Sequence, residues 1–140
     1  MQTAQSIHLG TTLRLACDYS TALTWTVEAL KSEGFGILTE IDVKETMQKK
    51  LGKEMLPFKI LGACNPPFAY QALTAAPEVG LLLPCNVTVR QLEDGVVEVA
   101  FVNPLMLLRV VDKPELIPIA EEIHARLERA AQAVREQNEL

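Results

Sequence analysis

Two apolar runs of strand length, both within residues 59–89, each meet a Cys-Asn pair, and this dipeptide occurs nowhere else in the chain. The first run ends at Cys64-Asn65 and is followed directly by two prolines. Asn before proline is typical of a helix N-cap with proline at the first helical position. The first Cys-Asn pair therefore predicts a corner at which a strand over residues 57–64 gives way to a short helix that ends before Pro77.

The second pair, Cys85-Asn86, lies within a run that we interpret as one long strand over residues 80–92. Pro84 interrupts this run, and proline cannot donate a hydrogen bond to a sheet ladder. We therefore expect an edge strand or a bulge at Pro84-Cys85. If this strand neighbours the strand that ends at Cys64, the two cysteines share one end of the sheet.

Hydrophobic spacing predicts most of the remaining elements. Apolar patterning predicts three further strands, over residues 11–17, 35–41 and 96–102. Helical spacing followed by a glycine predicts two helices, over residues 21–33 and 43–51. Glu93-Asp94-Gly95 predicts the hairpin turn that joins the last two strands. The run over residues 105–111 is apolar on all sides, which leaves strand and buried helix open.

The longest predicted element is a helix from Pro114 to about Gln137. It carries a single apolar stripe at spacings of three and four residues, made of Leu116, Ala120, Ile123, Leu127, Ala130 and Val134. We expect this stripe to cover the sheet, and part of it could instead face a second copy of the chain.

The element order β-α-β-α-β-α-β-β-α contains one tight hairpin and no glycine-rich crossover signature. It predicts an α+β fold with an antiparallel or mixed sheet of about five strands and helices packed on one face. The chain has no linker or low-complexity tract, so residues 1–140 are expected to form a single domain.

The composition excludes several function classes. With 49% hydrophobic and 22% charged residues the chain is close to the globular average. A net charge of −5 argues against nucleic-acid binding, which needs a basic surface. No run approaches the roughly 18 apolar residues of a membrane span. Residues 1–10 have neither the basic nor the apolar region of a signal peptide, and the three cysteines are expected to be reduced. These features predict a cytoplasmic protein.

The two corners form the candidate site, made of Cys64, Asn65, Cys85 and Asn86. The N-terminus of the helix after Asn65 suits a small anion or a carboxylate. The predicted partner is a small anionic or apolar ligand. A thiol beside such a helix end is expected to have a lowered pKa. The alternative is that both cysteines are buried apolar filler and that the asparagines serve only local hydrogen bonds.

Metal and cofactor chemistry has no support in the sequence. Cys64 and Cys85 do not form a Cys-x-x-Cys motif, and His8 and His124 lie at opposite ends of the chain. Glycine-rich phosphate-binding loops are missing. We therefore predict no metal site and no cofactor, and the sequence specifies no reaction.

The segments Gly62–Pro66, Leu82–Val87 and Phe101–Pro104 resemble the family called domain of unknown function 302. The resemblance extends from about Ser20 through the last predicted helix. It implies a stand-alone α+β domain with a topology like that of the TATA-binding protein, often dimeric and without an established activity. It assigns no catalytic role to any residue of this chain.

Three functions follow as hypotheses. The first is a binding module, cytoplasmic and homodimeric, that holds a small anionic or apolar ligand beside the two Cys-Asn pairs. The second is a thiol-dependent redox enzyme or sensor that uses Cys64 and Cys85. The third is a structural or interaction protein that dimerises through the last helix, in which case a charge at Ile123 or Leu127 would abolish the dimer.

Overall fold

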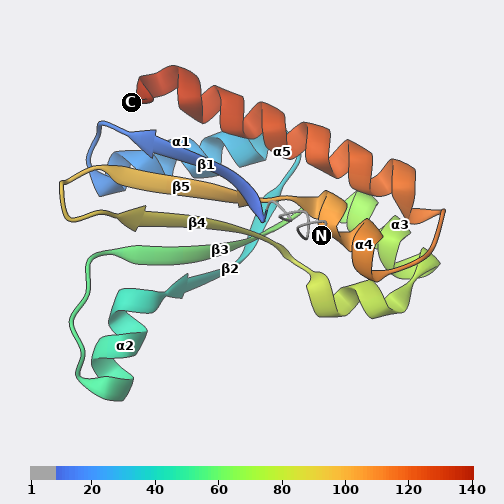
Figure 1. Cartoon of the computed structure of the whole chain (residues 1–140), viewed down its shortest axis with the longest axis horizontal. Helices are drawn as coiled ribbons and strands as arrows, with labels where there is room; N and C mark the ends of the chain where they lie inside the picture. The colour runs from blue at the N-terminus through green and yellow to red at the C-terminus, as the bar shows by residue number, and fades with distance from the viewer. Residues whose placement is uncertain (1–8) are drawn as a thin grey trace, which may run out of the picture.

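The computed structural model describes residues 9–140, so His8 and the N-terminal segment that is predicted to lack a signal peptide lie outside the described residues. Five antiparallel strands form one sheet in the order β1-β5-β4-β3-β2 (Figure 1). The strands are β1 (Gly10–Leu15), β2 (Gly36–Asp42), β3 (Phe58–Cys64), β4 (Cys85–Gln91) and β5 (Val97–Val102). The α+β prediction is confirmed, and the sheet is purely antiparallel.

Within residues 9–140, five α-helices and two short 3-10 helices complete the fold. They are α1 (Tyr19–Ser32), α2 (Val43–Leu51), α3 (Pro66–Ala75), η1 (Pro77–Leu82), η2 (Pro104–Met106), α4 (Leu107–Val110) and α5 (Leu116–Asn138). In Figure 1, α5 runs along the sheet and α3, α4 and η1 gather at one of its ends, whereas α2 lies beside the edge strand β2. None of the helices formed by residues 9–140 is long and apolar enough to cross a bilayer.

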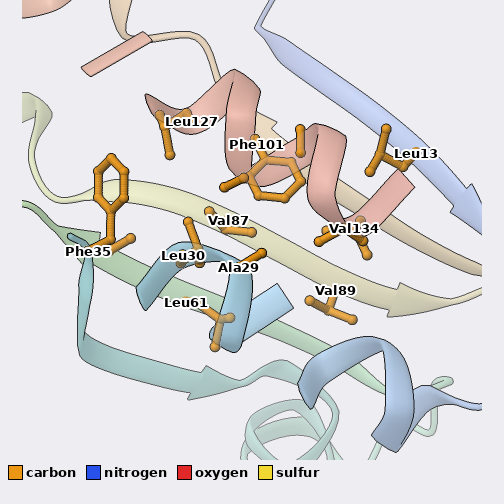
Figure 2. Close-up of a cluster of buried hydrophobic side chains, with 14 of the residues drawn as sticks. Leu13, Ala29, Leu30, Phe35, Leu61, Val87, Val89, Phe101, Leu127 and Val134 are labelled. Carbon is orange, nitrogen blue, oxygen red and sulfur yellow. The ribbon is translucent and has the colours of Figure 1, made fainter. Parts of the chain in front are cut away.

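The core lies between one face of the sheet and the helices α1 and α5. Every second residue of each core strand points toward this layer, as Leu13, Val87 and Phe101 do. These side chains pack with Leu30 of α1 and Leu127 of α5 (Figure 2). All six residues of the predicted α5 stripe are buried within the same chain. The stripe therefore covers the sheet, and the alternative in which it faces a second copy is wrong because its side chains are already enclosed.

Local signals set the ends of the first two helices, and the predicted glycine ends are confirmed. The Asp42 side chain accepts a hydrogen bond from the backbone N–H of Glu45 at the start of α2. Gly34 and Gly52 adopt positive φ angles of 89° and 64° just past the two helices, a conformation that glycine takes without steric cost. The α2 helix nevertheless has no buried side chain, because it lies beyond the edge of the sheet.

The predicted long strand over residues 80–92 is wrong in its first part. Residues 77–82 form η1, and β4 begins only at Cys85. Pro84 precedes the first ladder residue and follows a cis peptide bond. It therefore removes no ladder hydrogen bond, and β4 lies in the middle of the sheet instead of at its edge. The bulge lies in β2, where the register shifts between Ile37 and Thr39.

The ambiguous run over residues 105–111 is helical. After Asn103, whose side chain accepts the N–H of Leu105, the chain forms η2 and then α4. Leu107 of α4 packs in a second, smaller apolar cluster with Ala72 of α3 and Val79 of η1. This cluster holds the three short helices against the end of the sheet at which both Cys-Asn pairs are located.

Candidate functional site

Strand register brings the two cysteines together. In the β3–β4 pair, Ala63 lies opposite Cys85, so Cys64 and Cys85 lie on adjacent strands at the same end of the sheet. Both residues line one pocket. The expectation that strands three and four are neighbours and that their cysteines share one sheet end is confirmed.

The pocket has a volume of about 300 Å³ and is lined almost entirely by apolar atoms. Its floor is the end of β3 and the start of β4, and its walls come from the short helices and from the segment that follows α1. The apolar lining includes Phe35, Leu38, Ala69, Ala72, Leu73, Leu83, Leu107 and Ile123. None of the described residues that line it carries a charged side chain. The pocket is therefore suited to a small neutral apolar molecule.

Asn86 does not belong to this pocket. It is exposed, whereas its neighbour Cys85 is buried, because successive strand residues point to opposite faces of the sheet. Asn86 pairs with Gly62 on β3 and lies on the face away from the core. Of the four predicted site residues, the structure brings Cys64, Asn65 and Cys85 together and leaves Asn86 on the far face.

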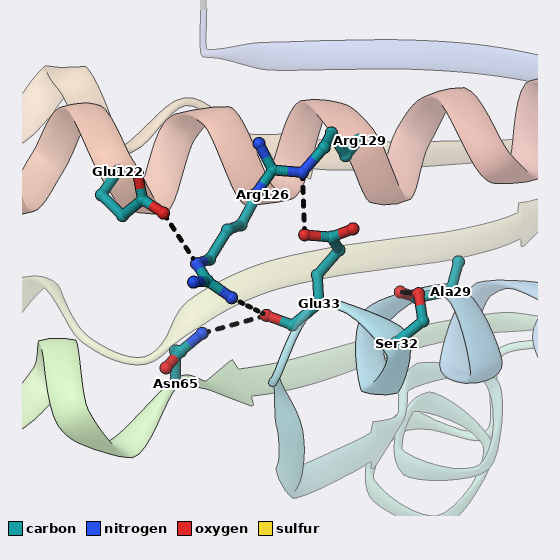
Figure 3. A network of polar contacts seen from close by, with 7 residues as sticks. All are labelled: Ala29, Ser32, Glu33, Asn65, Glu122, Arg126 and Arg129. Carbon is teal, nitrogen blue, oxygen red and sulfur yellow. Dashed lines mark hydrogen bonds and ion pairs between the residues drawn. The ribbon is translucent and has the colours of Figure 1, made fainter.

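Asn65 is buried, with 6% of its surface exposed, but it does not cap α3 with its side chain. The Nδ2 group donates to the backbone carbonyl of Glu33 over 3.1 Å, at the end of α1 (Figure 3). Gly34 makes this approach feasible, because a Cβ atom there would lie only 3.1 Å from Asn65 Nδ2. The predicted cap is thus wrong as to the hydrogen bond, since the amide is turned toward another helix.

Arg126 of α5 reinforces the same junction. Its Nη1 also donates to the Glu33 carbonyl, over 3.2 Å, and its Nε donates to Glu122 over 3.0 Å (Figure 3). The guanidinium carbon lies 5.2 Å from the ring centre of Phe68, within range of a cation–π interaction. This network ties the end of α1 and the start of α3 to the middle of α5 and holds Asn65 in place beside the pocket.

The start of α3 is a poor anion site. A helix N-terminus binds anions through free backbone N–H groups. Pro66 and Pro67 open α3 and have none, and the N–H of Ala69 already bonds the carbonyl of Asn65. Only Phe68 offers a donor in the first three positions. The structure therefore favours the apolar ligand over the anionic one.

The expectation of a lowered thiol pKa is wrong. Burial raises the pKa of Cys85 to about 11, and the nearby Cys64 thiol adds to this rise. Burial also raises the pKa of Cys64. The helix end beside Cys64 supplies too few N–H groups to offset desolvation. Both groups are neutral thiols at pH 7, which counts against a thiolate nucleophile.

Metal ligands do not gather near the pocket. Within residues 9–140 no group of three His, Cys, Asp or Glu side chains is arranged to hold a metal ion. His124 lies on α5 with its Nε2 3.8 Å from a Glu128 oxygen.

Sequence reasoning missed most of the pocket wall. Phe35 immediately precedes β2 and Leu38 lies within it, whereas Leu107 comes from α4 and Ile123 from α5. These residues are ordinary apolar side chains in segments far apart in the chain, and they carry no local signal of a site. The one usable hint was Pro84, which lines the pocket next to Cys85.

The fold and the site define a small α+β protein whose antiparallel sheet ends in an apolar pocket with two thiols. The family model described as "Domain of unknown function DUF302" matches residues 11–134, and the chain belongs to this family. A crystal structure of an uncharacterized conserved DUF302 protein from Bacillus stearothermophilus is similar, with a TM-score of 0.83 and 32% identity over 92% of this chain and 100% of the other. A search of curated proteins gives no match. The predicted family resemblance is confirmed.

Proposed function

We propose that this chain is a cytoplasmic binding module that holds a small, neutral, apolar molecule in the pocket beside Cys64, Asn65 and Cys85. The observation that carries the proposal is the apolar hollow of about 300 Å³ at the end of the sheet. Ligand pockets typically begin at about this size and are mostly apolar with few polar groups. Other surface hollows of the described residues are as large, but this one differs from them in its almost wholly apolar lining.

The size of the pocket limits the ligand. An engineered dry cavity of about 150 Å³ accommodates benzene. A pocket of twice that volume suits two fused rings or a branched aliphatic molecule of about a dozen non-hydrogen atoms. Burial of such a ligand is driven by the apolar area removed from water.

A thiol-dependent redox enzyme or sensor is the second candidate, and one observation favours it, namely that two thiols line one pocket. Their raised pKa values oppose it, because the thiolate is the reactive form. The binding proposal does not need a reactive thiol, so it agrees with both observations.

The proposal is tested by thermal shift with neutral probes, including 2-methoxynaphthalene, and with inorganic phosphate as the anionic probe. A ligand whose free concentration is about ten times its dissociation constant stabilises the folded state by about 1.4 kcal/mol. For a chain of this size we expect a rise in melting temperature of about 4 °C with a neutral probe. Phosphate is expected to have no effect. Absence of any shift across the neutral probes would refute the proposal.

Gly80→Leu is the blocking variant. Gly80 lines the pocket and has no positive φ, and a Cβ there makes only an ordinary 3.5 Å contact with Leu73. The leucine is expected to fill the pocket and abolish the shift without unfolding the chain. Gly36→Leu is the matched control, because Gly36 is also exposed, has no atom within 4 Å of a Cβ and lies outside the pocket. If the probe raised the melting temperature of Gly80→Leu as much as that of wild type, the ligand would bind outside this pocket.

A further inference from the structure

We infer that the pocket selects ligands which carry one neutral hydrogen-bond donor, such as a phenol, an indole or an alcohol, and that Asn65 Oδ1 accepts this hydrogen bond. The inference rests on the proposed function, because it assigns a ligand class to the same pocket. It gives Asn65 a role in specificity that is separate from its bond to Glu33.

The orientation of the Asn65 amide follows from its partner. The Glu33 carbonyl oxygen can only accept, so the atom that faces it at 3.1 Å must be Nδ2. Figure 3 shows Oδ1 on the opposite side of the amide, turned away from Glu33. The acceptor side of Asn65 is therefore directed away from the α1–α5 junction.

Oδ1 has no hydrogen-bond donor among the described residues, although Asn65 is 94% buried. Among residues 9–140, every side-chain nitrogen or oxygen atom that is sealed from solvent has a hydrogen-bond partner. Oδ1 therefore keeps some accessible surface, and because Asn65 is a lining residue of the pocket, we assign that surface to the pocket. A buried amide oxygen that opens onto an apolar pocket is a specific acceptor, because buried acceptors require a donor.

The surroundings of Oδ1 determine which donor fits. The lining formed by residues 9–140 contains no charged side chain, so a cationic donor would lose its hydration without a counter-charge. A carboxylate or phosphate would place negative charge against an acceptor oxygen. A hydroxyl or ring N–H on an apolar body satisfies Oδ1 and keeps the rest of the ligand in contact with carbon atoms. The geometry therefore favours neutral donors over ions of either sign.

The test compares two probes of nearly equal shape by isothermal titration calorimetry at pH 7. The donor probe is 2-naphthol, and 2-methoxynaphthalene has the same ring system without the O–H. A neutral hydrogen bond is expected to make 2-naphthol bind roughly three- to tenfold more tightly. The anion 2-naphthoate is expected to bind more weakly than both. Equal affinity for the two neutral probes would overturn the inference and leave the proposed function intact, whereas no binding by either would overturn both.

Variants assign the preference to Asn65. In Asn65→Ala the affinities for 2-naphthol and 2-methoxynaphthalene are expected to converge, with the latter changed by less than about twofold. Asn86→Ala is the matched control, because it removes an exposed amide outside the pocket, and it is expected to keep the full preference. Persistence of the preference in Asn65→Ala would overturn the inference.

A second measurement covers the case in which Asn65→Ala does not fold. In the wild-type protein, the side-chain amide signal of Asn65 in a ¹H–¹⁵N NMR spectrum is expected to shift with 2-naphthol. The shift with 2-methoxynaphthalene is expected to be much smaller. Equal shifts for the two probes would contradict a hydrogen bond to Oδ1.

Discussion

Cys85 illustrates how burial determines the chemistry of a residue. Only 7% of it is exposed, and it lies opposite Ala63 at the end of the sheet, where the central strand β4 begins. Desolvation raises its pKa from the ordinary 9.0 to about 11. A thiol with such a pKa acts as an apolar wall of the pocket at neutral pH. The sequence predicted that Cys85 shares one end of the sheet with Cys64, which the strand register confirms, and it predicted a lowered pKa only for Cys64 beside the helix end. How deeply Cys85 is buried depends on the tertiary packing.

The raised pKa of Cys85 makes stability depend on alkaline pH. The folded state keeps this proton up to about pH 11, whereas the unfolded chain releases it near pH 9. The contribution is therefore fully present below pH 9 and is lost as the pH rises toward 11. We expect the free energy of unfolding of wild type to fall by about 2 kcal/mol more than that of Cys85→Ala between pH 8 and pH 11, measured by urea unfolding.

The comparison separates Cys85 from other groups that titrate at high pH. Tyr19, whose pKa burial raises to about 12, is present in both proteins and cancels in the difference. Cys17→Ala is the control. Because Cys17 is less buried, this substitution should leave most of the pH dependence of the free energy of unfolding unchanged. Parallel pH curves for wild type and Cys85→Ala would contradict an elevated Cys85 pKa.

At the scale of elements, the start of α3 was predicted from Asn65-Pro66 and is confirmed at Pro66. The role of the Asn65 side chain was not predictable, because its partner Glu33 lies 32 residues away. The same limit applies to residues 80–83. Their apolar run fits a strand locally, but packing of Val79 against Ala72 and Leu107 stabilises a 3-10 helix.

Asn65→Asp distinguishes the two roles of this residue. Aspartate is as good an N-cap as asparagine, so a capping role predicts little change in stability. A carboxylate cannot donate to the Glu33 carbonyl and would face it with a second acceptor. We expect Asn65→Asp to lower the free energy of unfolding by about 2 kcal/mol in urea titrations. A change in the free energy of unfolding below about 0.5 kcal/mol would instead support a capping role for the Asn65 side chain.

At the scale of the molecule, α5 covers the face of the sheet that forms the core, and its stripe closes the fold. Homodimerisation stays a prediction, but the α5 stripe is not its surface because Ile123 and Leu127 are enclosed by their own chain. A charge at either position is expected to unfold the protein and not merely to dissociate a dimer.

Truncation of one stripe residue tests this assignment. Leu127, 1% exposed, contacts the sheet core, and Leu127→Ala is expected to cost about 2–5 kcal/mol of the free energy of unfolding. Ile117→Ala is the control on the same helix, because Ile117 is 45% exposed and its loss should cost less than about 1 kcal/mol. The stripe would instead lie at an interface if both variants lowered the free energy of unfolding by the same small amount and if Leu127→Ala changed the molecular mass measured by light scattering.

The sequence by itself determined the elements whose signals are local. The period of apolar residues, the glycines after α1 and α2 and the hairpin turn before β5 depend on neighbours within a few residues, so they predicted helices, strands and the α+β class correctly. Only the tertiary structure decided the strand order, the burial of Cys85, the partner of Asn65 and the pocket wall. These depend on contacts between segments far apart in the chain, and such contacts arise from the register of the whole sheet and the packing of α5, which no local pattern encodes.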